Sequence, residues 1–147
     1  MISGLIVGDG VIDWVAKRTN EYGRFGGGTA IGWQKDGEIV AGVVYCDWNG
    51  VNVVCHIASD GSKTWLTRHY LRTIFDYPYN QLNCNRITVE IGEGNAASLN
   101  LAMKLGFTVE ARLSQAHPTG DLLILRLWKS DCQWLSYEKT RPVLLRA

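Results

Sequence analysis

Two titratable side chains near the middle of the sequence have the chemistry to move protons. Glu90 lies in the β-branched run Arg86–Ile91, which is typical of a buried strand. His56 lies in a second apolar run, Val51–Ala58. A carboxylate or an imidazole beside a cleft can take a proton from a reacting group, so both are candidates for acid–base chemistry. Each also has a structural explanation, because Glu90 could be solvated or paired with Arg86, and a lone strand histidine is more often structural.

A candidate anion site follows the first of these strands. Gly92–Gly94 is typical of a turn, Asn95 of a helix N-cap, and Gly106 of the left-handed residue that ends a helix. Between them, Ala96–Leu105 has apolar residues at helical spacing. The start of such a helix offers unpaired N–H groups and the positive end of the helix dipole, which bind anions. Most such units bind nothing, however, and a capping role alone is enough to explain Asn95.

The elements that must position these residues can be predicted from periodicity and turn signals. We expect, in chain order, a strand, a helix, three strands, a helix, a strand, a helix and two strands. Their predicted bounds are Ser3–Val7, Asp9–Thr19, Thr29–Gln34, Ile39–Trp48, Val51–Ala58, Trp65–Tyr77, Arg86–Ile91, Ala96–Leu105, Thr108–Gln115 and Leu122–Trp128.

The turns between these elements determine how the strands are arranged. An Asp-Gly pair at 36–37 and an Asn-Gly pair at 49–50 are hairpin signals, so the three middle strands should form an antiparallel meander. The helix Trp65–Tyr77, which we expect Pro78 to end, then connects Val51–Ala58 to Arg86–Ile91. A strand–helix–strand unit predicts two parallel strands joined by a right-handed crossover.

Two segments fit none of these elements. The glycine cluster in Asn20–Gly28 could cradle a phosphate, but it lacks the GxxxxGK[ST] pattern, and we interpret it as a linker rather than a substrate-side loop. The tail Lys129–Ala147 carries Trp134 and could pack on the sheet or on a second subunit, which makes a homodimer an expectation.

Composition limits the classes of function. The chain has 147 residues, 46% of them hydrophobic and 20% charged, and predicts a single domain over residues 1–147. A net charge of +1 gives no electrostatic reason to expect a nucleic acid or a membrane surface as partner. The first residues lack a signal-peptide pattern, so we expect a cytoplasmic protein. The four cysteines form no metal-binding pattern, and we interpret them as core residues, with a nucleophilic cysteine beside His56 as an alternative.

The segment Val89–Phe107, VEIGEGNAASLNLAMKLGF, resembles the strand–helix motif of the GNAT superfamily of N-acetyltransferases. With the order of elements, the resemblance extends over Glu38–Trp128 and is greatest to the ribosomal-protein N-terminal acetyltransferases. It implies an α+β fold, in which a mixed, mostly antiparallel sheet has splayed parallel central strands and is flanked by helices.

The resemblance also implies a cosubstrate and where it binds. Acetyl-CoA would lie between the two splayed strands, with its pantetheine arm on their free edges and its pyrophosphate on the loop Ser59–Thr64. A backbone N–H near Ile57 or Ala58 would polarise the thioester. The implied cofactor-binding residues are Ile57, Ala58, Ser59, Gly61, Ser62, Lys63, Thr64, Asn95 and Ser98.

The sequence departs from the family pattern at two places. Ser62 and Thr64 stand where the phosphate loop usually has glycines, so their hydroxyls and the charge of Lys63 would have to replace close backbone contacts. Ala102 stands where the family has a tyrosine general acid, and Ser98, one turn earlier on the same face, is the nearest replacement.

These observations together predict an acetyl-CoA-dependent N-acetyltransferase acting on a primary amine. Glu90 would be the base, His56 the second choice for proton relay, and Ser98 the proton donor. We favour a protein or peptide amine, an N-terminus or a lysine, over a small molecule. The two departures favour the alternative, a non-catalytic acyl-CoA-binding or protein-interaction module on the same fold.

Overall fold

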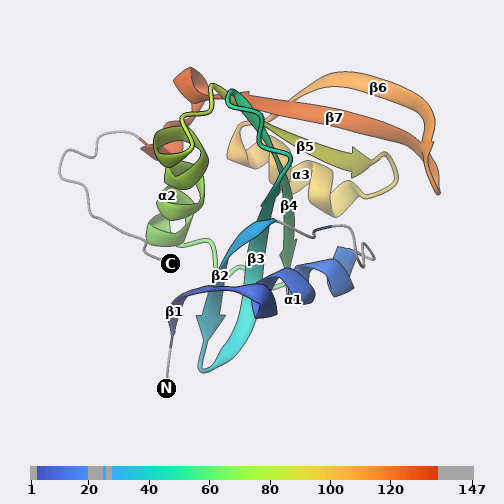
Figure 1. The fold of residues 1–147 in the computed structure, drawn as a ribbon. Coiled ribbons are helices and arrows are strands. Elements are labelled where there is room, and N and C mark those ends of the chain that lie inside the picture. The colour runs from blue at the N-terminus through green and yellow to red at the C-terminus, as the bar shows by residue number, and fades with distance from the viewer. Residues whose placement is uncertain (1–2, 20–24, 26–27, 136–147) are drawn as a thin grey trace.

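One mixed sheet organises the molecule. The computed structural model describes residues 3–19, 25 and 28–135, and its strands form a seven-stranded sheet in the order β1-β2-β3-β4-β5-β7-β6 (Figure 1). Only β4 and β5 run parallel; the other neighbours are antiparallel. This confirms the predicted α+β fold with a mostly antiparallel sheet. The strands are β1 (Gly4–Val7), β2 (Thr29–Lys35), β3 (Glu38–Cys46), β4 (Asn52–Ser59), β5 (Arg86–Gly92), β6 (Thr108–His117) and β7 (Gly120–Trp128).

In the part of the chain that the structure describes, three α-helices flank the sheet, namely α1 (Asp9–Thr19), α2 (Arg68–Asp76) and α3 (Ala96–Leu105). Helix α1 has the predicted bounds, and its buried residues Val11, Val15 and Ala16 recur at helical spacing. Two short 3-10 turns, at Lys129–Asp131 and Gln133–Leu135, follow β7. Among the described residues, no helix combines the length and the apolar character that crossing a bilayer requires.

The start and the end of α2 differ from the prediction. The helix begins at Arg68 rather than Trp65, because the Thr67 side chain caps it by accepting from the N–H of Tyr70. Trp65 is buried ahead of the helix, where its indole N–H donates to the Ser62 carbonyl at 2.9 Å. Nor does Pro78 end the helical path. The chain continues through a π-helical turn, Tyr77–Gln81, in which proline takes a first-turn position that needs no N–H donor.

The parallel strands β4 and β5 pair over a short stretch only. Their register joins Asn52 to Arg86, Val53 to Ile87 and Val54 to Thr88, and no pair follows. Each strand continues beyond this point, held on its other side by β3 or β7. The predicted splay of the two central strands is therefore confirmed.

The two faces of the sheet bury different clusters. On β3, Tyr45 belongs to the larger cluster, which contains the buried residues of α2 and α3, whereas its neighbour Val44 belongs to a smaller cluster with Val11 and Val15 of α1. Because successive strand side chains point to opposite faces, α1 covers one face, and α2 and α3 cover the other.

The two segments that fitted no predicted element are only partly described. Of Asn20–Gly28, the structure describes Phe25 and Gly28, so the interpretation of this loop lies outside the described residues. In the tail, the Trp134 indole N–H donates to the Leu105 carbonyl at 3.0 Å, and its ring stacks on Phe75 at 6.4 Å. Trp134 thus packs on helices of its own chain, and the predicted homodimer stays a prediction.

Close packing of α1 on β3 depends on Gly42. A Cβ atom there would lie 2.7 Å from a Val15 methyl and 2.9 Å from a Val11 methyl. We expect Gly42→Ala to lower the free energy of unfolding by about 1–3 kcal/mol, since overpacking a well-packed core forces side chains and backbone to shift. Urea denaturation measures this loss in the free energy of unfolding. In Gly10→Ala, where nothing lies within 4 Å of the new methyl, the same change should raise stability by about 0.4–1 kcal/mol. Equal effects at both positions would contradict the packing argument.

Candidate active site

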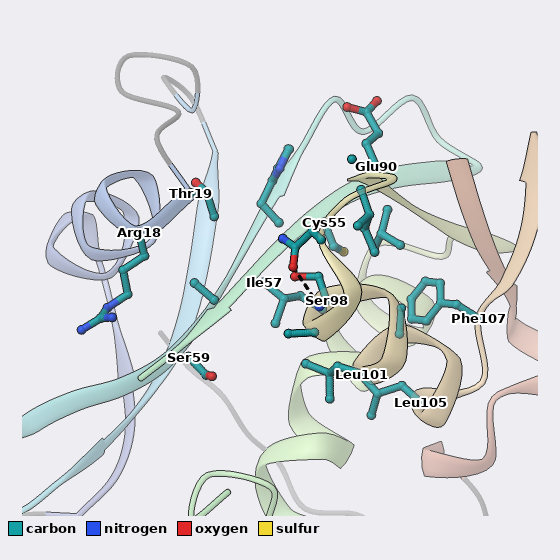
Figure 2. Close-up of a pocket in the computed structure, with 18 of the residues that line it drawn as sticks. Arg18, Thr19, Cys55, Ile57, Ser59, Glu90, Ser98, Leu101, Leu105 and Phe107 are labelled. Carbon is teal, nitrogen blue, oxygen red and sulfur yellow. Dashed lines mark hydrogen bonds between the residues drawn. The ribbon is translucent and has the colours of Figure 1, made fainter. Parts of the chain in front are cut away.

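A cavity of about 660 Å³ opens where β4 and β5 separate (Figure 2). Its walls are residues 55–59 of β4, residues 89–92 of β5 and one side of α3, and residues of α1 and β6 complete it. Glu90, His56 and Ser98, the three predicted catalytic residues, all line it. So do Ile57, Ala58, Ser59, Gly61 and Asn95 of the predicted cofactor-binding set.

The two candidate proton-transfer residues lie on the α1 face of the sheet. His56 is 7% exposed, and its ring lies 4.6 Å from that of Phe25, a member of the α1 cluster. On β5, Val89 belongs to the opposite cluster, so alternation puts Glu90 on the same face as His56. The structure therefore places both groups on the side of the cavity opposite α3.

Cys55 does not form a nucleophile with His56. It precedes His56 on β4 and packs in the larger cluster, on the other face of the sheet. Burial, with smaller effects from Cys84 and Cys46, raises the pKa of the Cys55 thiol well above its ordinary value. A thiol that stays protonated at neutral pH is a poor nucleophile, so the alternative of a reactive cysteine loses its support here.

Helix α3 forms the opposite wall through the predicted capping residues. Asn95 Oδ1 accepts from the backbone N–H of Ser98 at 3.1 Å, and Gly106 takes the left-handed conformation with φ 112° at the other end. Ala102 lines the cavity and is buried. No phenol can therefore come from that position, and Ser98 is the hydroxyl that α3 contributes to the cavity.

Two N–H groups of the loop after β4 are already satisfied within the loop. Gly61 N–H donates to Ser59 Oγ at 3.1 Å, and both the N–H and the hydroxyl of Ser62 donate to Asp60 Oδ1, at 2.9 and 2.7 Å. The hydrogen bonds from Ser62 lower the pKa of Asp60, so its carboxylate is charged at neutral pH. Ser62, Lys63 and Thr64 lie outside the lining of the cavity. An incoming phosphate would have to displace Ser59 Oγ to use the Gly61 N–H and Asp60 to use the Ser62 N–H.

Three residues that line the cavity are not predicted as site residues from the sequence. Arg18 and Thr19 come from the last turn of α1, and His117 comes from the end of β6. Arg18 lies over the Trp14 ring at 4.3 Å and is close enough to Asp60 to lower its pKa further. Figure 2 shows Arg18 on the Ser59 side of the cavity and Glu90 at the other end. The amphipathic pattern of α1 predicts a helix but not the strand ends that its last turn will face.

Comparison with known proteins adds evidence at the level of the fold. No family model and no curated protein matches the chain. Among solved structures, spermidine N-acetyltransferase SpeG from Vibrio cholerae in complex with CoA and spermine has a TM-score of 0.63 and 16% identity, over 84% of this chain and 78% of that chain. A chimera of SpeG and hSSAT has a TM-score of 0.61 and 15% identity, over 84% of this chain and 80% of that chain. The fold is that of the GNAT N-acetyltransferases.

The splayed strands of this GNAT fold are the feature that creates the cavity. At 15–16% identity the likeness concerns the fold and does not extend to individual site residues. These two neighbours are named for polyamines, not for ribosomal proteins. The chemistry of this chain must therefore be argued from its own cavity.

Proposed function

We propose that the chain is an acetyl-CoA-dependent N-acetyltransferase that acts on a primary amine. The observation that carries this proposal is the separation of β4 from β5 after Val54 and Thr88. From there on the facing edges of two strands have no strand between them, yet each strand is held on its outer side. An extended molecule with amide groups, such as the pantetheine arm of CoA, can pair with such edges as a strand would.

The cavity lining supports direct transfer of the acetyl group. Glu90 takes a proton from the ammonium form of the acceptor, and the neutral nitrogen attacks the thioester carbonyl carbon. The new C–N bond forms, the C–S bond breaks, and the electron pair leaves with sulfur. A backbone N–H at Ile57 or Ala58 stabilises the oxyanion. The nitrogen loses its second proton as the amide forms, and the Ser98 hydroxyl would relay a proton to the departing sulfur without remaining an alkoxide. A thiol is acidic enough to leave with little such help.

The charges around the cavity fit an anionic ligand at the Ser59 end. Among the described lining residues, Arg18 is the one lysine or arginine. It comes from the last turn of α1 and is close enough to Asp60, in the phosphate loop predicted from the family resemblance, to lower the pKa of that carboxyl group. We propose that Arg18, rather than Lys63, supplies the nearest positive charge to the phosphates of CoA. The neighbour SpeG was crystallised with CoA and spermine, which is consistent with CoA as cosubstrate.

We favour a peptide or protein amine as the acceptor, of the kind that ribosomal-protein N-terminal acetyltransferases use. The neighbours are named for spermidine, a molecule with several positive charges. Of the described cavity residues, Glu90 is the one carboxylate. A single carboxylate can balance the charge of one ammonium group but not of three. A small polyamine is the competing acceptor class.

Two measurements test the proposed function. Isothermal titration should detect binding of both acetyl-CoA and CoA, and a CoA-release assay with peptides and small amines should then detect transfer. Binding without release for any amine would favour the second candidate, a non-catalytic acyl-CoA-binding module, which the alanine at position 102 motivates. Absence of binding at high micromolar ligand would exclude both.

The charge of Asp60 should weaken CoA binding. We expect Asp60→Asn to increase affinity for CoA about 3- to 10-fold, because it removes one negative charge a few ångströms from the phosphates. The gain should shrink as salt is added. Hydrogen bonding lowers the pKa of Asp60, so Asp60 should stay charged as the pH falls from neutral well into the acidic range. Protonation of Asp60 should therefore not change the CoA affinity of the wild type in that range.

A matched control is available at the β2–β3 turn. Asp36 has φ 53°, a conformation that asparagine also tolerates. Asp36→Asn changes net charge by the same amount away from the cavity and should leave CoA affinity unchanged. If both variants bind CoA equally well, the effect is one of net charge and the local argument is wrong.

A further inference from the structure

His117 packs against Gly92 at the end of β5, where a residue with a side chain would collide with the imidazole ring. A Cβ atom on Gly92 would lie 2.7 Å from His117 Cε1 and 2.8 Å from both ring nitrogens. The imidazole therefore covers the Gly92 backbone. Since Glu90 and Gly92 are two residues apart on one strand, their Cβ positions point to the same face. His117 thus lies on the face of the sheet that carries Glu90, and it lines the same cavity.

The hairpin that carries His117 is fastened to the turn between β5 and α3. Arg112 pairs with Glu93 and with Asp121, each at 2.9 Å. The N–H of Asp121 donates to Glu93 Oε2 at 2.9 Å, and the N–H of Glu93 donates to the Asp121 carbonyl at 3.0 Å. This network joins β6, β7 and the end of β5, so it fixes where the tip of the hairpin lies relative to the cavity.

One nitrogen of the ring is held by its neighbour. The backbone N–H of Thr119 donates to His117 Nδ1 at 3.2 Å, and the Thr119 hydroxyl lies 3.0 Å from the same atom. Nδ1 is therefore an acceptor, and the hydrogen-bond network assigns the proton of the neutral ring to Nε2. Among the described residues, Thr119 is the ring's only hydrogen-bond partner. The Nε2–H group is left as a donor for whatever occupies the cavity.

We infer that His117 selects acceptors that carry a carbonyl oxygen next to the amine, by donating a hydrogen bond from Nε2 to that oxygen. The inference rests on the proposed function and narrows its substrate class. A carbonyl oxygen accepts from a neutral imidazole, whereas an ammonium or alkyl group gains nothing from it. The acceptor class is thus an α-amino amide, such as a peptide N-terminus, rather than a polyamine.

The spacing on β5 agrees with such a ligand. Positions 90 and 92 of a strand lie about 6.6 Å apart, and a hydrogen bond from each side chain spans about 2.9 Å. A small group between the Glu90 carboxylate and the His117 imidazole can therefore have its amine near the first and its adjacent carbonyl oxygen near the second. The charged groups of the hairpin network, Arg112, Glu93 and Asp121, are paired with one another and do not compete for the Nε2–H group.

Alaninamide and isopropylamine test the inference, because they differ by the carboxamide group. We expect His117→Ala to lower kcat/KM for alaninamide about 3- to 10-fold and to leave the value for isopropylamine unchanged, as removal of one neutral hydrogen bond predicts. For each amine we compare kcat/KM of the variant with kcat/KM of the wild type, so the different basicity of the two amines cancels. Gly92→Ala, which keeps the imidazole but displaces it, should have the same effect. His69→Ala, an exposed histidine of α2 outside the cavity lining, should preserve the wild-type ratio.

The outcomes separate the inference from the proposed function. An unchanged ratio in His117→Ala, or an equal loss for both amines, overturns the role of His117. A wild-type protein that acetylates spermidine but neither test amine overturns it too, while the proposed function stands. A wild-type protein that releases CoA with none of the three amines and with none of the peptides overturns both.

Discussion

Replacement of Glu90 by glutamine should lower kcat/KM for acetyl transfer by about 10²- to 10⁴-fold, the usual contribution of a general base. Glutamine keeps the size of the side chain but cannot take the proton of the ammonium group. The Kd for CoA should change by less than about twofold, since an interaction made only during the reaction affects rate and not cofactor binding. Glu90 lies at the end of the cavity opposite Ser59, away from the proposed phosphate site (Figure 2).

Steady-state kinetics over a range of pH checks this prediction. The deficit of the Glu90→Gln variant should become smaller as pH rises, because the amine then loses its proton to water without the enzyme. Glu38→Gln is the matched control, because Glu38 is an exposed residue at the start of β3 and lies outside the cavity lining. A Glu90→Gln variant as active as this control would remove Glu90 from the mechanism and leave His56 as the remaining candidate.

Filling the cavity from α3 should strongly weaken cofactor binding. Ser98 is partly buried and lines the 660 Å³ space between the separated strands. An indole at this position occupies the volume that we assign to the pantetheine arm. We expect Ser98→Trp to weaken CoA binding by roughly 100-fold, about 2.8 kcal/mol. Isothermal titration measures the affinity, and thermal unfolding establishes that the variant is folded.

Met103 provides a control on the same helix. It is 51% exposed, so tryptophan there adds the same volume outside the cavity. Met103→Trp should bind CoA as the wild type does. If Ser98→Trp is folded and still binds CoA with wild-type affinity, the cofactor lies elsewhere and the proposed site is wrong.

Local signals in the sequence were sufficient for most of the framework. Helix α1 has the bounds that its apolar spacing predicts, and the strands on either side of the turns at 36–37 and 49–50 pair antiparallel as predicted. The Asn95 cap and the Gly106 stop are also where the sequence predicts them. Each of these features depends on residues within a few positions of one another, so the information needed is local.

Where tertiary packing competes with a local pattern, the prediction fails. Trp65 has helical spacing, yet it is buried before α2 begins, because Thr67 provides the cap and the indole N–H finds a partner in the loop. At the other end, Pro78 lies inside a π-helical turn in which the buried Tyr79 hydroxyl donates to the Leu127 carbonyl of β7. The first boundary depends on a cap and a hydrogen bond within three residues, and the second on a contact between segments about 50 residues apart.

The sequence by itself therefore determined most of the elements, since strand alternation and helical spacing are properties of short segments, and the family resemblance added the splayed strand pair and the roles of the candidate residues Glu90, His56 and Ser98. Only the tertiary structure decided what shares the cavity with them. Arg18 and His117 reach it from α1 and from the β6–β7 hairpin, and Asp60 accepts from the Ser62 N–H in the loop where a phosphate was expected. These placements depend on how distant segments pack and on which hydrogen bonds a loop closes, and neither is encoded in local periodicity.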